Sequence, residues 1–489
     1  MEDRLRNLQS LFEPRTLAFV GATDKIGKWG FIVFNNIIHG GWAGRLVPVN
    51  PGREEVLGLK AYPSVSAIPG EVDAAVISVP AAAVKATVAD CAAKGVKAAV
   101  VISAGFKEMG GEAALLEAEM VAEARAAGLV LAGPNGQGIF SAANKLFAWM
   151  PTYCFPPAGP VAVISQSGNV QGLMVQELIE LNLGVSRGVS SGNEADLRME
   201  DYYAWLAEDD RTKVILSYME GVTDGTRFLK LAAETTRKKP VVLLKGGRSS
   251  LGMNAARSHT GALAVSDEVF SSACRQAGVI MAGSIRQAAY IAAALVGRPL
   301  PRGRRVGILT GGGGLGVISA DVCAREGLEV PPLSSTTIDQ LRGLMPSWWV
   351  PGNPVDLVAG LKFDAIPAIL ETLMRSGELD AILFPFIGAE STERNLKPLN
   401  EQTARMIAGW KKMESFSGAF QKLIAELMAK TGVPVLGVTN FGRERDRENW
   451  DRLPPERAVF LRDFETACEA LAAVVRYAEF RRVATTSSP

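Results

Sequence analysis

Short apolar runs rich in β-branched residues recur along the chain, and three of them lead into a glycine-rich turn and then a helical pattern. They are TLAFVGATDKIG (16–27), GPVAVISQSGNVQG (159–172) and RRVGILTGGGGLG (304–316). A buried parallel strand reads as a continuous apolar run, and a crossover helix must follow it. Each stretch is therefore predicted to be the first strand–turn–helix step of an α/β domain.

Further strand-like runs follow each opening, separated by helical segments. They are RLVPVNP, AAVISVP, AAVVISAG and LVLAGPNG, then GVSRGVSSG, KVILSYMEG and PVVLLKGG, and finally LDAILFPFIG and VPVLGVTNFG. This alternation predicts doubly wound parallel sheets. Proline and glycine gather at 149–160 and 296–305, which indicates domain joints there. We therefore expect three α/β domains over residues 1–148, 149–297 and 298–489, the last closed by a long helix over 455–482.

Length and composition agree with this picture and exclude several classes of protein. A chain of 489 residues exceeds what one core usually supports. The 52 basic and 51 acidic residues leave a net charge of +1 with no basic block, which argues against a nucleic-acid partner. Five scattered cysteines without a CxxC pair are typical of a reduced cytosolic protein. No signal peptide or membrane-spanning run is recognisable, so we expect a cytoplasmic protein with no membrane partner.

The first glycine turn, GATDKIG, is typical of a phosphate site at a helix N-terminus. A nicotinamide dinucleotide site would also need an acidic residue at the end of the second strand. That strand ends at Asn50 and Pro51 instead, which disfavours a dehydrogenase. Another nucleotide fits better, with coenzyme A (CoA) as one candidate, while a turn that only packs strand on helix is the alternative.

Three further strand ends, SVP (78–80), SAGF (103–106) and GPNG (133–136), also stop at small or amide residues. Because the carboxyl ends of parallel strands form the ligand crevice of an open sheet, four such ends together favour a site, although ordinary turns could explain any one. The candidate cofactor-binding residues on these turns are Gly21, Ala22, Thr23, Lys25, Asn50, Pro51, Val79, Pro80, Ser103, Ala104, Gly105, Phe106 and Asn135.

The second glycine turn offers Ser167, Gly168 and Asn169 at a strand-to-helix junction, which is a good seat for a phosphate or oxyanion. No GxxxxGK[ST] motif is present, so it is not a P-loop. Glu220 ends the strand KVILSYMEG and could hydrogen-bond one nitrogen of an imidazole, leaving the other as a free nucleophile. A solvated charge at a strand end is the alternative for Glu220.

His259 is one of only two histidines and lies among small residues in AARSHTGALA. No Cys, Asp or second His lies near enough to share a metal, so no metal site is expected. The Gly-, Ser- and Ala-rich surroundings favour a loop that changes conformation, and a neutral imidazole can attack phosphorus near pH 7. A histidine that only caps a turn is the alternative. His39, directly before Gly40 and Gly41, is expected to satisfy carbonyls at a helix end.

With these residues in place, the chain resembles the nucleoside-diphosphate-forming acyl-CoA synthetases: the α subunit of the ADP-forming acetyl-CoA synthetase and, more distantly, that of succinyl-CoA synthetase. The resemblance runs in the family's order over about residues 10–480. The matching stretches are VGATDKIGKWG, PVNPGREEVLGLKAYPSV, VISAGFKEMG, GPNGQG, ISQSGNVQG, SSGNEADL, YMEG, LLKGGRS, AARSHTGALA and NPVDL.

The resemblance implies a Rossmann-like CoA-binding domain followed by two flavodoxin-like ligase domains. His259 matches the family's transiently phosphorylated histidine, Glu220 the glutamate that supports it, and residues 167–169 the turn that holds the phosphoryl group. In such enzymes acyl-CoA and phosphate give an acyl phosphate and free CoA. The phosphoryl group then passes to histidine, the loop swings, and a nucleoside diphosphate collects it at an ATP-grasp domain.

The chain also departs from the family. It stops where fused members continue into the ATP-grasp domain, so we expect a separate ATP-grasp β subunit that brings ATP or ADP and Mg²⁺, in a hetero-oligomer, with a homodimer as the other possibility. It reads GPNGQG and LAVS where the family commonly has GPNCLG and LAG, which implies an unusual acyl pocket. The leading hypothesis is the catalytic α subunit of a nucleoside-diphosphate-forming acyl-CoA synthetase, which forms acyl-CoA from a small carboxylic acid, CoA and ATP; the choice between ADP and GDP stays open. The alternatives are a non-catalytic CoA-binding regulatory or scaffold protein and a nucleotide-independent acyl transferase.

Overall fold

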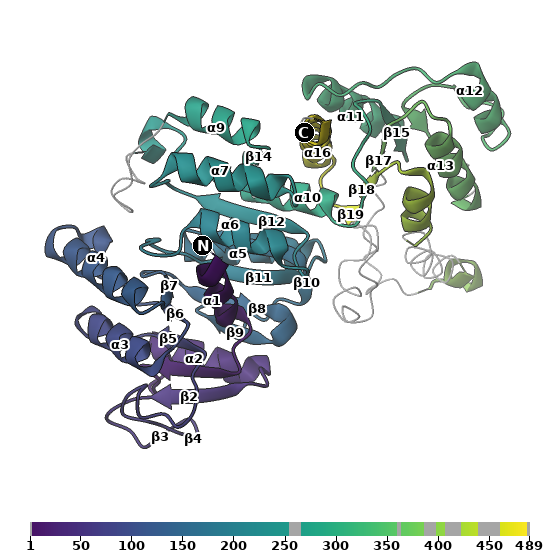
Figure 1. Cartoon of the computed structure of the whole chain (residues 1–489). Helices are drawn as coiled ribbons and strands as arrows, with labels where there is room; N and C mark the ends of the chain where they lie inside the picture. Colours follow the sequence, from purple (N-terminus) through teal and green to yellow (C-terminus); the bar gives the residue numbers. More distant parts are fainter. Residues whose placement is uncertain are drawn as a thin grey trace. The chain divides into compact units, whose positions relative to one another are not determined.

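The computed structural model describes residues 2–253, 266–358, 363–385, 398–405, 422–438 and 460–486. Contacts divide the chain into two compact units, residues 1–179 with 183–288 and residues 180–182 with 289–489. The first unit contains two large sheets and the second contains one (Figure 1). No helix in the described parts of the chain is both long and apolar enough to cross a lipid bilayer.

The first sheet has five parallel strands in the order β2-β1-β5-β6-β7. These strands are β1 (Thr16–Val20), β2 (Arg45–Val49), β5 (Ala74–Ile77), β6 (Ala98–Val101) and β7 (Val130–Ala132). The helices around them are α1 (Glu2–Phe12), α2 (Trp29–Gly40), α3 (Ala81–Lys94) and α4 (Gly111–Ala126), with a short pair β3 (Glu55–Val56) and β4 (Leu59–Lys60) and the 3₁₀ turn η1 (Lys107–Met109).

Successive residues of these strands enter two different cores, which explains their continuous apolar runs. Phe19 and Val76 pack in a core that includes Phe34 of α2, whereas their neighbours Ala18 and Ile77 pack in a core shared with α3 and α4. A strand covered by helices on both faces needs apolar residues at every position. The doubly wound arrangement predicted from the sequence is therefore confirmed for this sheet.

The second sheet has seven strands in the order β14-β13-β12-β10-β11-β8-β9. Its parallel part contains β10 (Ala158–Ser165), β11 (Val185–Ser190), β12 (Val214–Met219), β13 (Val241–Lys245) and β14 (Ile280–Ala282). The antiparallel hairpin of β8 (Gly138–Ser141) and β9 (Leu146–Trp149), joined by η2 (Ala142–Asn144), adds to β11, an edge that the sequence analysis did not predict. The helices whose bounds the described residues give here are α5 (Gly168–Glu180), α6 (Met199–Glu208), α7 (Gly225–Thr236), α9 (Asp267–Gln276) and α10 (Ile285–Leu295), within which the first unit ends at residue 288.

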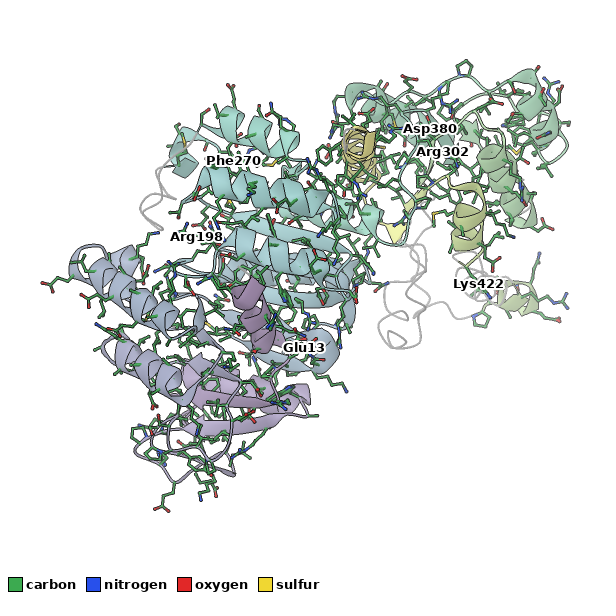
Figure 2. All side chains as sticks on the ribbon, viewed as in Figure 1. Glu13, Arg198, Phe270, Arg302, Asp380 and Lys422 are labelled. Carbon is green, nitrogen blue, oxygen red and sulfur yellow. The ribbon has the colours of Figure 1, made fainter. Side chains whose placement is uncertain are left out.

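The second unit contains a five-stranded parallel sheet in the order β16-β15-β17-β18-β19. Its elements are β15 (Val306–Thr310), β16 (Val355–Asp356), β17 (Ala381–Pro385), β18 (Val435–Val438), β19 (Phe460–Leu461), η3 (Phe363–Ala365), α11 (Gly313–Arg325), α12 (Ser335–Arg342), α13 (Ile366–Arg375) and α16 (Phe464–Thr486). Arg305 fixes the start of β15 by donating to both carboxylate oxygens of Asp380 at 3.0 and 2.9 Å (Asp380 is labelled in Figure 2).

The long C-terminal helix begins later than the sequence predicted. Residues 460 and 461 extend the sheet as β19, and the helix starts only at Phe464. Asp463 explains the start, because its carboxylate accepts a hydrogen bond from the backbone N–H of Thr466 at 2.6 Å, as an N-cap does.

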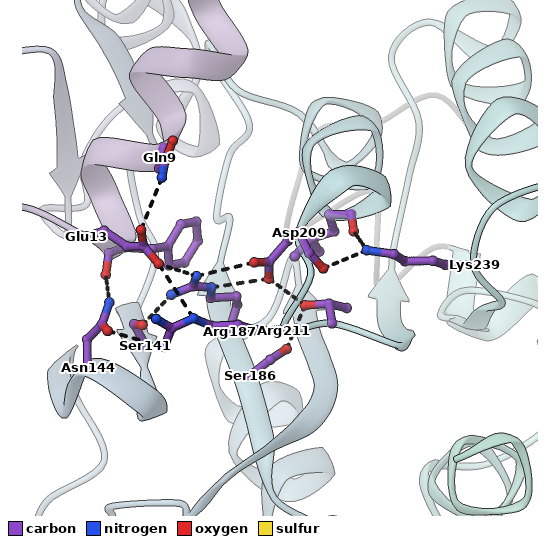
Figure 3. A network of polar contacts seen from close by, with 12 residues as sticks. Gln9, Glu13, Ser141, Asn144, Ser186, Arg187, Asp209, Arg211 and Lys239 are labelled. Atoms are coloured by element: carbon purple, nitrogen blue, oxygen red, sulfur yellow. Dashed lines mark hydrogen bonds and ion pairs between the residues drawn. The ribbon is translucent and has the colours of Figure 1, made fainter. Parts of the chain in front are cut away.

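A buried cation ties several elements of the first unit together. Arg187 on β11 is only 2% exposed and donates to Glu13 at 2.6 Å and to Asp209 at 3.3 Å, and it also contacts Ser141 of β8 (Figure 3). Its guanidinium lies 5.5 Å from the ring centroid of Phe12 at the end of α1. The guanidinium of Arg187 therefore holds together the end of α1, the strand β8 and the residues that follow α6, which are far apart in the sequence.

Candidate active site

The predicted cofactor-binding residues all lie on turns that follow strands of the first parallel sheet. Gly21 follows β1, Asn50 follows β2, Val79 lies two residues beyond β5, Ser103 two beyond β6 and Asn135 three beyond β7. In parallel strands these ends share one edge of the sheet, which is where open α/β sheets bind ligands. The structure therefore brings together five segments that are widely separated in sequence.

Some of these residues shape the turns rather than face outward. A Cβ atom on Gly21 would lie 2.2 Å from the carbonyl oxygen of Ser78, so only glycine fits there. The side chain of Asn50 donates to the carbonyl of Ala22 at 2.9 Å and accepts from the N–H of Gly52 at 2.9 Å. Both polar ends of Asn50 thus hold the backbone of two neighbouring turns.

Exposure divides the remaining candidates. The side chains of Ala22 and Phe106 are fully buried, so a ligand could meet only their backbone. The exposed members are Lys25, Pro51, Pro80 and Ala104, and the half-buried ones are Thr23, Val79, Ser103, Gly105 and Asn135. Small residues, backbone N–H groups and the cation of Lys25 along this edge fit the phosphates and the flexible arm of CoA.

In the second sheet, the predicted phosphate turn and Glu220 lie side by side. Ser167 lies two residues beyond the end of β10 and directly before α5. Glu220 directly follows β12, the parallel neighbour in which Tyr218 pairs with Ser165. One side chain bridges them: the amide oxygen of Gln166 accepts from the N–H groups of Glu220 at 2.6 Å and Gly221 at 3.1 Å. The amide nitrogen of Gln166 donates back to the carbonyl of Gly221 at 2.9 Å.

Glu220 is half-buried and surrounded by groups that organise it. The hydroxyl of Tyr218 donates to its carboxylate at 3.3 Å, and Lys245 donates to its backbone carbonyl at 2.7 Å. Burial, and then the charge of Glu220, raise the pKa of Tyr218 to about 12, so this hydroxyl remains a donor at neutral pH. Burial also lowers the pKa of Lys245, whose ammonium lies 5.7 Å from the ring centroid of Phe270 (labelled in Figure 2).

Of the two histidines, the structure describes only His39. His259 lies outside the described residues. His39 lies in the last turn of α2, where its Nδ1 is 3.0 Å from the carbonyl oxygen of Asn35, and Gly41 follows in the left-handed conformation with φ 81°. His39 therefore lies at the helix end that the sequence predicts, but its ring meets the carbonyl of Asn35, one turn inside α2, rather than one of the last carbonyls of the helix.

A network of amides and carboxylates connects the edges of the two sheets. Asn135, after β7, donates to Asn193 in the loop after β11 at 3.2 Å. Asn193 in turn donates to Glu108 at 2.6 Å and to Glu117 at 2.9 Å. Burial raises the pKa of Glu117. Burial would also raise the pKa of Glu108, but hydrogen bonds from Asn193 and from the N–H of Gly105 lower it overall.

Several of these organising residues were missed in the sequence, notably Gln166, Asn193 and Lys245. Gln166 directly precedes the candidate Ser167 in ISQSGN, and an amide at a strand end next to a glycine turn is the one signal that could have marked it. Asn193 and Lys245 act across sheet edges, and nothing in their local sequence indicates their partners.

Glu194, in the same loop as Asn193, provides a test of this local chemistry. Burial raises the pKa of its carboxyl to about 7, against hydrogen bonds from Ser191 and Gln166 that lower it. The folded protein then holds a proton that the unfolded chain releases above about pH 4.5, so stability falls as pH rises from about 5 to 7.5. At pH 8 Glu194→Gln is expected to have a free energy of unfolding about 3 kcal/mol higher than that of the wild type, and therefore to unfold at a higher urea concentration. At pH 5 the two proteins should have the same free energy of unfolding. Parallel stability curves for the two proteins over this range would contradict the assignment.

Comparisons with known proteins agree with this geometry. Residues 15–141 match the family described as a CoA binding domain, and residues 158–295 match the succinyl-CoA ligase like flavodoxin domain. The chain is 38% identical to the acetate–CoA ligase [ADP-forming] II subunit alpha of Pyrococcus furiosus over 87% of this chain and 94% of that protein. It is 42% identical to the I subunit alpha of the same organism over 72% of this chain and 76% of that protein.

A solved structure gives the same result over nearly the whole chain. The dinucleotide-forming acetyl-coenzyme A synthetase 1 of Ca. Korarchaeum cryptofilum, in complex with phosphate and ADP, superposes with a TM-score of 0.82 at 32% identity and covers 99% of each chain. The resemblance, the α/β fold and the enzyme class read from the sequence are thereby confirmed. The chain belongs to the family of ADP-forming acyl-CoA ligase α subunits.

Proposed function

We propose that this chain is the phosphoryl-transferring subunit of an ADP-forming acyl-CoA synthetase, with His259 as its phosphorylated residue. The observation that carries the proposal is the bridge made by Gln166, which holds the helix start at Ser167–Asn169 beside the backbone of Glu220. A helix N-terminus favours a phosphoryl group, and a carboxylate next to it can orient an imidazole.

The reaction follows from these groups in two transfers. A phosphate oxygen attacks the acyl carbon of the thioester; the carbon–sulfur bond breaks and CoA leaves as the thiol. The imidazole of His259 then attacks phosphorus, the bond to the acyl oxygen breaks, and the carboxylate leaves. Glu220 would hold the proton on the other ring nitrogen, and backbone N–H groups at the start of α5 would balance the phosphoryl charge.

Coenzyme A and the nucleotide have separate places in this proposal. The turns of the first sheet, within the match to a CoA binding domain, would hold CoA and present its sulfur to the second sheet. The solved relative contains ADP and phosphate, and two relatives are named as alpha subunits. We therefore assign the nucleotide and Mg²⁺ to a separate ATP-grasp partner, and a small carboxylic acid to this chain as its acyl substrate.

The decisive experiment is the intact mass of the purified chain after incubation with phosphate and a thioester. Relatives named for acetate, 4-hydroxybutyrate and ferulate suggest the set to test: acetyl-, 4-hydroxybutyryl- and feruloyl-CoA. We expect an acid-labile gain of one phosphoryl group with at least one of them and none when phosphate is omitted. No label with any thioester, with the ATP-grasp partner present or absent, would favour a CoA-binding scaffold instead.

A further inference from the structure

Gln137 lies in GPNGQG, at a position where the sequence departs from its family, and its backbone is anchored on both sides. Its N–H donates to the hydroxyl of Ser190, at the end of β11, at 2.8 Å. Its carbonyl accepts from the N–H of Met150 at 2.9 Å. Because the main chain is held at two points, the direction in which the side chain leaves it is also fixed.

That side chain lies on the start of α5. A Cβ atom on Gly168 would come within 2.1 Å of Cγ of Gln137, so the glutamine occupies the space that any other residue at 168 would need. The amide nitrogen of Gln137 donates to Oδ1 of Asn169 at 3.0 Å. The glutamine therefore contacts two of the three residues assigned to the phosphate turn.

We propose that Gln137 is a positioning residue for the phosphate turn, acting through the orientation of Asn169. When Oδ1 of Asn169 accepts from Gln137, the amide Nδ2 of Asn169 points the other way and adds a donor to the N–H groups at the start of α5. The inference rests on the proposed function, because it names a residue that prepares the same turn for inorganic phosphate. A leucine, which the family commonly carries here, can fill the space but cannot orient the amide.

The test compares Gln137→Leu and Gln137→Glu with Gln176→Leu, a matched change on the exposed side of α5. The readout is the phosphate concentration that gives half-maximal labelling of the chain, beside the thioester concentration that does so. Gln137→Leu should raise the phosphate value about 5- to 10-fold and leave the thioester value within about 2-fold. Gln137→Glu should raise it further, since the new carboxylate turns the donor of Asn169 toward itself and repels phosphate. Gln176→Leu should change neither value.

A second readout does not depend on turnover: the rise in Tm that inorganic phosphate produces in each protein. The expected result is a clear rise in the wild type and in Gln176→Leu, and a smaller rise in both Gln137 variants. If wild type and Gln137→Leu need the same phosphate concentration for half-maximal labelling, the inference is overturned. It is also overturned if the half-maximal phosphate and thioester concentrations rise together, because that result marks a merely structural residue. If the wild type gains no label but phosphate stabilises it more than the Gln137 variants, the positioning role stands and the proposed function fails.

Discussion

Replacing His259 with alanine is expected to remove the acid-labile phosphoryl label, a loss of at least about 10³-fold in the rate of phosphoryl transfer. The reason is chemical: alanine offers phosphorus no nucleophile, while the helix start and Glu220 remain. Formation of CoA from the thioester should continue for at most one turnover of acyl phosphate. The measurement is intact mass before and after acid treatment, with free CoA assayed in parallel.

The chain supplies its own control, because His39 is the only other histidine. His39→Ala removes a ring whose Nδ1 lies 3.0 Å from the carbonyl of Asn35, one turn back in α2, so it should cost about 0.5–1 kcal/mol of stability. It should keep the full label. The amount of phosphoryl label on Glu220→Gln should lie between the amounts on His259→Ala and His39→Ala, since the neutral amide of the new glutamine does not stabilise a cationic imidazole as the carboxylate does. A label that persists in His259→Ala would place the phosphoryl group on another residue and contradict the proposal.

Much of this architecture could be predicted because short stretches of the sequence are enough to indicate each strand and turn. Strands such as β5 and β6 are covered on both faces, so every position is apolar and the run is visible without knowing its neighbours. The glycine turns after β1 and β10 are equally legible, because a helix must begin there. His39 could be assigned from two glycines alone, since the end of a helix has a short sequence signature.

The rest depended on contacts between distant residues. Gln166 interacts with residues 54 and 55 positions away, and Asn193 with carboxylates 76 and 85 positions away. The hairpin of β8 and β9 reads as two more apolar strands, and only its pairing with β11 reveals an antiparallel edge. Gln137 stands out as a departure from the family, but its contact with Gly168 is visible only in the structure, because Gln137 precedes β8 and Gly168 follows β10 in the same sheet. The residues that organise a site at the edge of a sheet come from distant parts of the chain, so no single stretch of sequence indicates which of them will contact one another.

Arg187→Met is expected to lower the free energy of unfolding of the first unit by about 3–5 kcal/mol, the largest effect on stability that we predict. Methionine fills much of the volume beside Phe12 but leaves Glu13 and Asp209 without their buried cation. Urea unfolding followed by tryptophan fluorescence measures the change, because Trp205 lies 5.6 Å from the same guanidinium. Loss of less than about 1 kcal/mol would show that water enters and solvates the two carboxylates.

Arg211→Met is the matched control, since Arg211 meets the same Glu13 at 3.9 Å but is 46% exposed. An exposed ion pair contributes little, so this variant should lose at most about 1 kcal/mol.

The pH dependence of the stability lost in Arg187→Met shows whether Arg187 acts through its charge or through its packing. Burial would raise the pKa of both Glu13 and Asp209, but hydrogen bonds from Arg187 lower both below their ordinary values of 4.5 and 3.8. Their stabilisation is therefore present above those values and lost as pH falls through the lowered ones, so the gap between wild type and Arg187→Met should be widest near pH 7 and narrow below about pH 4. A gap that stays constant with pH would mean that Arg187 acts through its packing against Phe12 and Trp205 rather than through its charge.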